Sequence, residues 1–212
     1  ALIYPSLPNI SHLVKYYPKQ PLQIYSKEGL LIAEFGEERR DFIAISETPQ
    51  QMINAILSIE DRRFFEHPGI DFIGIARAAL KNITGRSHEG ASTITMQVAR
   101  NFFLTPEKTF KRKINEILLA IKIERTLSKE EILELYINQI YLGQRSFGFA
   151  AAANTYYGKN LDQLNLGETA LLAGLPKAPS RYNPLVRPHL AIKRQQNVLN
   201  SMLRHGYIDK PT

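Results

Sequence analysis

The sequence places one carboxylate, Glu60, where a helix would bury it. Glu60 lies four residues after Ile56 and four before Phe64, on the apolar stripe that this spacing predicts. The segment is expected to be helical, opened by the capping signal at 48–49 and stopped at 68–69. An unpaired charge is costly to bury, so Glu60 has a partner, keeps its proton, or lies at the wall of a cleft. The spacing alone favours a structural Glu paired with a nearby Arg.

A second carboxylate, Glu116, lies close to a group of cations. The segment 108–125 is expected to belong to a helix that opens at 105–106. Cations are disfavoured at the start of a helix, so their presence there indicates that the charge is used. These cations are Lys108, Lys111, Arg112 and Lys113. Because Glu116 is three or four residues from two of them, a solvated ion pair that contributes little is the alternative.

A third candidate is the start of the helix expected within 89–103. Ser92, Thr93 and Thr95 lie where the apolar helical spacing begins, and Gln97 and Arg100 follow one and two turns further in. Free N–H groups, hydroxyls and the positive end of the helix dipole together favour a phosphate. Since Ser and Thr are also ordinary helix caps, capping alone is the alternative.

These three features together indicate glycosyl transfer. A pair of carboxylates is typical of chemistry at an anomeric carbon, where one moves a proton and the other handles charge or position. A neighbouring basic cluster suggests a phosphorylated sugar. The combination therefore favours transfer with a phosphate leaving group over simple glycoside hydrolysis.

Other chemistries have little support in the sequence. The five histidines show no metal-ligand spacing, and no Gly-rich phosphate loop or nucleophile elbow occurs. His67, directly before Pro68, is expected to be a packed residue at a helix end. The absence of cysteine excludes disulfides and thiolate metal sites.

The composition is that of a folded globular chain with an anionic partner. It has 212 residues, 44% of them apolar and 22% charged, and a formal net charge of +7. That charge favours nucleic acid, a membrane surface or a phosphorylated substrate. No apolar run is long enough to span a membrane, so any anchor is expected to lie in a segment not in this chain.

The predicted elements are mostly helices. Residues 1–21 are expected to form an irregular arm, and 23–36 a hairpin that turns at Gly29. Capping boxes at 128–131 and 165–168 open two helices, and Pro188 opens the last one. The helix expected from 105 carries an apolar stripe of Phe110, Ile114, Ile117, Leu118 and Ile121. No linker forces a boundary, so a single, mainly α domain over 1–212 is predicted.

Five segments of the chain together resemble one family. They are EDRRFFEHPGID, GASTITMQVARN, KRKINE, ILELYINQIYLG and ALLAGLPKAPSRYNP, in this order. Their order and spacing are similar to the five motifs of the peptidoglycan glycosyltransferases (transglycosylases, glycosyltransferase family 51), found in class A penicillin-binding proteins and monofunctional transglycosylases. The resemblance runs from about residue 22 to the end. The second motif and the Tyr-rich lead-in look more like a bifunctional protein of the 1A kind.

The resemblance implies a fold and a reaction. The fold is lysozyme-like and mainly α, with a head lobe, a smaller membrane-facing jaw lobe and here a short N-terminal β hairpin. The enzyme polymerises lipid II into linear glycan strands with inversion, and undecaprenyl pyrophosphate leaves. Glu60 matches the general base that takes the proton of the acceptor 4-hydroxyl, which explains a carboxylate on an apolar stripe.

The same resemblance assigns roles to the other candidates. Glu116 matches the second catalytic glutamate, which orients the basic residues. The positions matching or beside the substrate-binding wall are Asp61, Phe64, Ser92, Gln97, Arg100, Lys108, Arg112, Lys113 and Asn138. This chain departs from the family at Gly90-Ala91 and Met96-Gln97, where Gly-Gly and Gln-Gln are usual, and Lys108 stands where some members have Arg.

The implied surroundings are those of cell-wall synthesis. No cofactor is required, although a divalent cation could accompany the substrate pyrophosphate. The expected partners are lipid II, the growing glycan and the membrane surface, with other cell-wall synthesis proteins as further candidates and no nucleic acid. The expected location is the outer, periplasmic face of the bacterial cytoplasmic membrane. An exposed apolar surface is expected between residues 70 and 110, with Lys81, Arg86 and Lys111 at the headgroups.

Two rival functions remain open at this point. A lytic transglycosylase or muramidase would act on finished glycan and needs no phosphate site, so the basic cluster opposes it. A non-catalytic domain that binds anionic lipid or nucleic acid would follow from the charge alone. It predicts salt-sensitive binding to DNA and no effect of Glu60→Gln.

Overall fold

The computed structural model describes residues 8–10, 13, 22–35, 38–83, 92–104 and 109–209. Its contacts divide the chain into two compact units. Unit 1 comprises Ala1–Tyr16 and Glu60–Tyr136, and unit 2 comprises Tyr17–Ile59 and Ile137–Thr212. The predicted single domain stays a prediction, and most of the predicted N-terminal arm lies outside the described residues.

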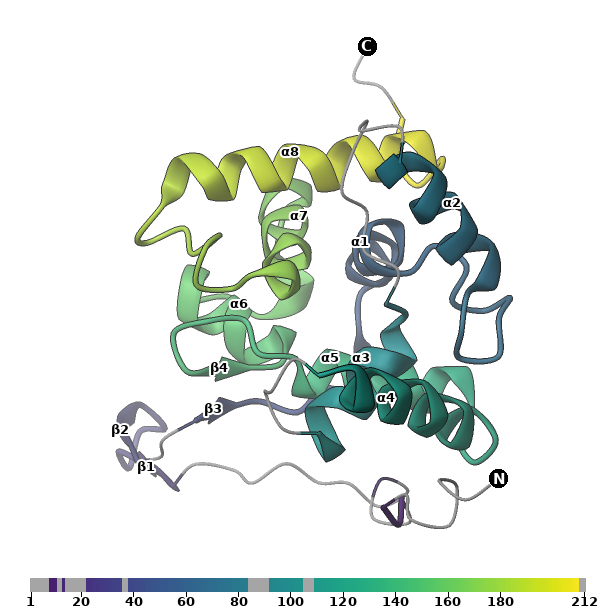
Figure 1. The fold of residues 1–212 in the computed structure, drawn as a ribbon. Coiled ribbons are helices and arrows are strands. Elements are labelled where there is room, and N and C mark those ends of the chain that lie inside the picture. The colour runs from purple at the N-terminus through teal and green to yellow at the C-terminus, as the bar shows by residue number, and fades with distance from the viewer. Residues whose placement is uncertain are drawn as a thin grey trace. The chain divides into compact units, whose positions relative to one another are not determined.

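Unit 1 is built from helices around the segment that follows Glu60. Its elements are α2 (Phe72–Ile83), α3 (Ile94–Phe103), α4 (Phe110–Glu124) and the larger part of α5 (Lys129–Gln139) (Figure 1). The core contains fully buried side chains from several of them, including Phe64, Ile94, Leu119, Ile123 and Ile132. Helices α3, α4 and α5 therefore contribute side chains to the core of this unit.

Unit 2 combines two small sheets with helices. Strands β1 (Leu22–Tyr25) and β2 (Leu31–Phe35) are antiparallel, and β3 (Arg39–Arg40) pairs in parallel with β4 (Ser146–Phe147). The helices are η3 (Ile45–Glu47), α1 (Gln50–Glu60), α6 (Phe149–Tyr157), η4 (Leu161–Gln163), α7 (Leu166–Gly174), η5 (Leu175–Lys177) and α8 (Pro188–Arg204). The last residue of α1, Glu60, belongs to unit 1. Figure 1 shows α7 against α8, and Gln51 on α1 donates to Thr169 on α7 at 2.8 Å.

Several local predictions are confirmed. The hairpin turns at Gly29, whose φ of +85° is the left-handed conformation that glycine adopts without strain. At the start of α5, Ser128 N–H donates to Glu131, and Glu131 N–H donates to the Ser128 hydroxyl. Asn165 and Glu168 form the same reciprocal cap on α7, and α8 begins at Pro188. These signals are reliable because each depends only on neighbouring residues.

The helix that carries Glu60 is shorter than predicted. It ends at Glu60, and residues 61–69 form turns in place of a continued helix. Phe64 is fully buried as expected, but it reaches the core from this turn segment. The hydroxyl of Thr48, the expected cap, donates to the carbonyl of Ala44 at 3.0 Å. Residues 61–71 make hydrogen bonds to distant helices in place of continued helical hydrogen bonds. A local sequence pattern cannot predict these long-range contacts.

The apolar stripe predicted for the helix that carries Glu116 is not the face that the helix buries. Phe110 is 93% exposed and Ile114 49% exposed, whereas α4 buries the face that carries Glu116, Leu119, Ala120 and Ile123. Both faces have helical apolar spacing, so periodicity could not choose between them. Thr109 caps α4 by accepting from Arg112 N–H, and the predicted start at 105–106 lies outside the described residues.

Candidate active site

Glu60 is the last residue of α1 and is held by a neutral partner. It is half-buried, and its Oε2 accepts a 3.0 Å hydrogen bond from the side-chain amide of Gln97. Gln97 lies on α3 and is only 5% exposed. This amide donor orients the carboxylate and brings no charge of its own.

Asp61 occupies the start of α3. Its carboxylate accepts from Ile94 N–H at 2.9 Å and from His67 Nε2 at 2.9 Å. Thr93 caps the same helix by accepting from Met96 N–H at 3.2 Å. The expectation of a phosphate at this helix start is therefore corrected, because the chain's own carboxylate and hydroxyl take the N–H groups of Ile94 and Met96.

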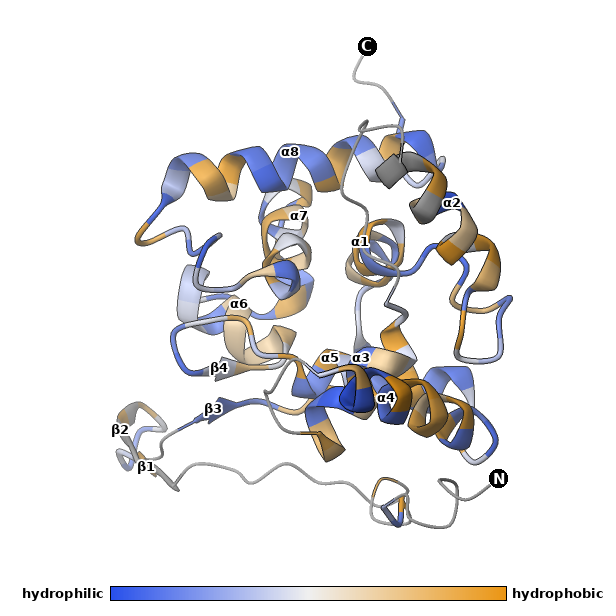
Figure 2. Ribbon diagram, in the orientation of Figure 1, coloured by the Kyte–Doolittle hydropathy of each residue, from blue (hydrophilic) through white to orange (hydrophobic). Residues whose placement is uncertain are grey.

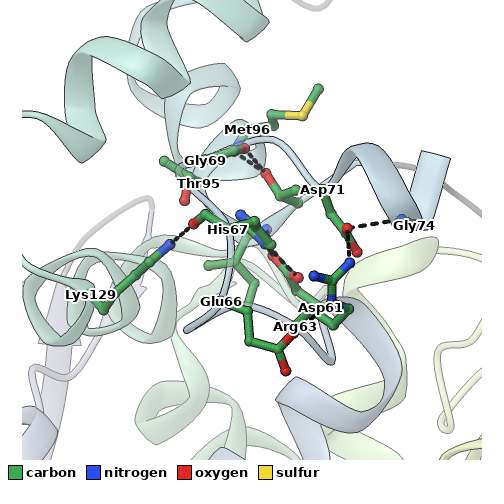
Figure 3. Close-up of polar contacts among 12 residues, drawn as sticks. Asp61, Arg63, Glu66, His67, Gly69, Asp71, Gly74, Thr95, Met96 and Lys129 are labelled. Atoms are coloured by element: carbon green, nitrogen blue, oxygen red, sulfur yellow. Dashed lines mark hydrogen bonds and ion pairs between the residues drawn. The ribbon is translucent and has the colours of Figure 1, made fainter. Parts of the chain in front are cut away.

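The segment after Glu60 is tied to its surroundings at both of its ends. Besides the contacts of Asp61, the Thr93 hydroxyl donates to the carbonyl of Gly69 at 2.6 Å. At its far end, Asp71 accepts from Arg63 and from Gly74 N–H, as Figure 3 shows. His67 is buried against the Phe64 ring, so the expectation that it is packed is confirmed, but it lies in the turn segment after α1 and not at a helix end. Its bond to Asp61 was not foreseen.

Glu116 lies in a chain of polar contacts that begins at the surface. The ammonium of Lys113 donates to the hydroxyl of Ser92 at 2.9 Å and to Oε1 of Glu116 at 2.8 Å. The Lys113 side chain is 42% exposed, whereas that of Glu116 is 1% exposed. The solvated ion pair considered above is thus wrong. Among the described residues, no hydrogen-bond partner reaches the buried Oε2 of Glu116.

Unit 1 holds the described candidate residues other than Asn138. Arg100 and Arg112 are half-buried on α3 and α4, and Lys108 lies outside the described residues. Phe64 is fully buried beneath the ammonium of Lys129, whose Nζ lies 4.5 Å from the ring centroid. The substrate contacts assigned to Phe64 and Asp61 stay predictions.

Asn138 belongs to unit 2, and its side chain is also buried and hydrogen-bonded to the main chain. Its side-chain amide accepts from Ile43 N–H at 2.9 Å and donates to the carbonyl of Ile43 at 2.8 Å. Asn138 is 3% exposed, so these two bonds anchor the segment before α1. The substrate contact assigned to Asn138 stays a prediction.

Sequence reasoning missed two polar residues of unit 1, Glu124 and Lys129. Lys129 donates to Oε1 of Glu124 at 2.7 Å and to the carbonyl of His67 at 2.7 Å. The pair spans the turn between α4 and α5, where helical spacing gives no signal. Among the described residues, no cluster of three or more acidic or histidine side chains is arranged to hold a metal.

The comparison with known proteins decides the family. A family model described as Transglycosylase matches residues 28–203. The chain belongs to the transglycosylase family. The predicted enzyme class, a peptidoglycan glycosyltransferase, and the predicted mainly α fold with a short hairpin are confirmed.

Similar proteins share one name, penicillin-binding protein 1A. The protein of Neisseria gonorrhoeae is 55% identical over 206 residues, 97% of this chain and 26% of that protein. The Pseudomonas aeruginosa protein is 53% identical over 207 residues, again 97% of this chain and 25% of that protein. The Haemophilus influenzae crystal structure has a TM-score of 0.52 and 33% identity, covering 92% of this chain and 20% of that one. This chain thus spans about a quarter of the length of the curated relatives it matches.

Proposed function

We propose that this transglycosylase domain polymerises lipid II into linear glycan strands, with Glu60 as the general base. The acceptor 4-hydroxyl oxygen attacks the anomeric carbon of the donor as its proton passes to Glu60. The bond from that carbon to the pyrophosphate oxygen breaks, undecaprenyl pyrophosphate leaves, and the anomeric configuration inverts. The observation that carries this proposal is the half-buried Glu60 carboxylate held by the neutral amide of Gln97.

The donor pyrophosphate is proposed to bind at the start of α4. Lys113 is 42% exposed and is directed by Ser92 and Glu116, so one face of its ammonium stays open to an anion. Arg112 is its neighbour, and Arg100 and Lys108 are proposed to contribute as well. Glu116 acts by orienting Lys113, since its buried carboxylate is beyond the reach of a substrate. A divalent cation, where one takes part, would accompany the pyrophosphate.

A membrane surface is the proposed setting of the reaction, because donor and acceptor both carry lipid chains. In unit 1, α2 exposes Phe72 (69%), Ile73 (59%) and Leu80 (67%), and Figure 2 shows hydrophobic colour along this helix. The start of α4 adds the exposed Phe110 beside Lys111. Apolar side chains next to cations favour an anionic bilayer surface. Arg86 and the Lys81 side chain, also expected there, lie outside the described part of the chain.

The location on the outer, periplasmic face of the cytoplasmic membrane, and an anchor outside this chain, belong to the same proposal. Among the described residues, no helix has the length and apolarity of a membrane span. The growing glycan and other cell-wall synthesis proteins are the further partners proposed.

The test is polymerisation of lipid II in detergent, followed as glycan on a gel. Wild type should give polymer, and Glu60→Gln, which keeps the shape but removes the base, should give none while retaining the wild-type melting temperature. Glu130→Gln, an exposed carboxylate on α5, is the matched control and should polymerise normally. Equal polymer from Glu60→Gln and wild type would contradict the role of Glu60. Solubilisation of purified cell walls without polymerisation would favour a lytic enzyme, and salt-sensitive DNA binding without polymerisation a nucleic-acid binding domain.

A further inference from the structure

The ammonium of Lys129 lies against the segment that follows Glu60. Nζ donates to the carbonyl of His67 at 2.7 Å and stands 4.5 Å from the centroid of the Phe64 ring. Figure 3 shows Lys129 reaching this carbonyl from α5. The Lys129 side chain is 19% exposed. A charge that is mostly removed from water and directed at a main-chain oxygen fixes that part of the segment.

Glu124 connects the same ammonium to α3. Its Oε1 accepts from Lys129 at 2.7 Å and from the hydroxyl of Thr95 at 2.5 Å. The Glu124 side chain is 8% exposed, and Thr95 is fully buried on α3. Removing either charge would leave the other buried without its partner, which is far more disruptive than breaking a surface pair.

Close packing reinforces this connection at Gly69. Its φ is +87°, and a Cβ placed there would lie 2.9 Å from Cγ of Glu124 and 3.1 Å from the carbonyl oxygen of Ala120. Only glycine therefore allows the segment to lie this close to α4. The side chain of Glu124 is confined between Gly69, Thr95 and Lys129.

The Lys129–Glu124 pair thus joins the two structures that hold Glu60. One is the segment 61–71, which continues directly from Glu60 and receives the bond of Lys129 at His67. The other is α3, which receives the bond of Glu124 at Thr95 and carries Gln97, the donor to the Glu60 carboxylate. A displacement of either structure would move the carboxylate relative to its amide donor.

We propose that Lys129 and Glu124 are positioning residues for Glu60. They touch no reacting atom in this scheme; they keep the segment after Glu60 and the helix that carries Gln97 in register. The inference rests on the proposed role of Glu60 as the base. Substituting either residue should therefore lower kcat, because a misplaced base affects the transition state and leaves lipid binding intact.

The first measurement is steady-state kinetics of the 212-residue chain with lipid II. Lys129→Met keeps the aliphatic stem and should lower kcat by about 10- to 100-fold, the range expected for a catalytic group misplaced by about 1 Å. KM should stay within about threefold of wild type, since lipid binding is untouched. Lys129→Arg, which keeps the charge and the donors, should recover most of kcat. The matched control is Lys159→Met, which breaks a Lys–Glu pair of the same 2.7 Å length in unit 2 and should leave kcat unchanged.

The second measurement is hydrogen exchange, which reports position without activity. In Lys129→Met, the amides of 61–71 and of Ile94 should exchange faster, while those of α7 and α8 should match wild type. Glu124→Gln should show the same pattern, and the double variant should lose less than the sum of the two single losses. Should Lys129→Met fail to fold, Glu124→Gln and Lys129→Arg provide the same comparison.

The outcomes separate this inference from the proposed function. Wild-type kcat and wild-type exchange of 61–71 in both Lys129→Met and Glu124→Gln would overturn the positioning role, and an inactive Glu60→Gln would then still support the base. A raised KM with unchanged kcat would also overturn it. A fully active Glu60→Gln would contradict the proposed function, and the positioning role would be lost with it.

Discussion

Within unit 1, the side-chain amide of Gln97 on α3 lies 3.0 Å from Oε2 of Glu60 and donates to it. The amide is a neutral donor that helps to set the direction of the carboxylate. Replacing this amide by a carboxylate of the same shape removes the donor and adds a negative charge at this point. The pair therefore offers a direct way to alter the proposed base without removing it.

Gln97→Glu should move the acidic limb of the pH–rate profile to higher pH. Two carboxylates at this distance cannot both ionise easily, so a shared proton occupies the base until the pH rises. The measurement is the initial rate of lipid II polymerisation between about pH 5 and 9, the range in which a carboxylate pair and its neighbours titrate. Gln97→Met, which removes the donor and adds no charge, should lower the rate and move the limb by less, because only one neutral hydrogen bond to the carboxylate is lost. An unmoved limb in Gln97→Glu would argue against Glu60 as the group that titrates.

Within unit 2, α1 is anchored two residues before Glu60. The hydroxyl of Ser201 on α8 donates to the carbonyl of Ser58 at 2.6 Å, and both residues are buried. Ser201→Ala should lower the free energy of unfolding by about 1 to 2 kcal/mol, because a buried carbonyl loses its donor. Urea denaturation measures this loss. Ser128→Thr, which keeps a capping hydroxyl on the exposed start of α5, is the control and should change stability little. A Ser201→Ala variant as stable as wild type would contradict the anchoring role.

Substitutions on the two apolar faces of α4 should change stability by very different amounts. Leu119 is fully buried, so Leu119→Ala should lower the free energy of unfolding by about 2 to 5 kcal/mol. Phe110 is 93% exposed, so Phe110→Ser should change stability by less than about 0.5 kcal/mol. If α4 docks on a bilayer, Phe110→Ser should instead weaken sedimentation with anionic liposomes. A large loss of stability in Phe110→Ser would show that this face is packed in solution.

The sequence predicted best what depends on neighbouring residues. The reciprocal caps at Ser128 and Asn165 and the turn at Gly29 need only residues close by in the chain, and all three form. The face of α4 was predicted wrongly, because Leu119 and Ile123 are as apolar as Ile114 and Ile121. What selects the buried face is packing against distant parts of the chain such as α3, which no local pattern contains.

The candidate site followed the same division. Motif resemblance brought Glu60, Gln97, Lys113 and Glu116 into view, and the described structure joins them in two pairs. The resemblance could not reveal that Asp61 accepts from the first N–H group of α3, since Asp61 and Ile94 are far apart in the chain. Lys129 and Glu124 were missed for a similar reason, because their meeting depends on the turn between two helices.

Alkaline pH should destabilise unit 2 through two neighbouring tyrosines on α6. Burial raises the pKa of Tyr156 to about 12 and that of Tyr157 to about 12, the latter also through the negative charge of Glu168. Because the folded pKa lies above the ordinary value of 10.0, the contribution to stability is complete below about pH 10. It is lost as the pH rises toward about 12, where both phenols ionise. Tyr157→Phe cannot ionise, so its urea midpoint should fall less steeply than that of wild type over this interval. Tyr207→Phe, on the segment after α8, is the control and should follow wild type; parallel curves for all three proteins would contradict the assignment to α6.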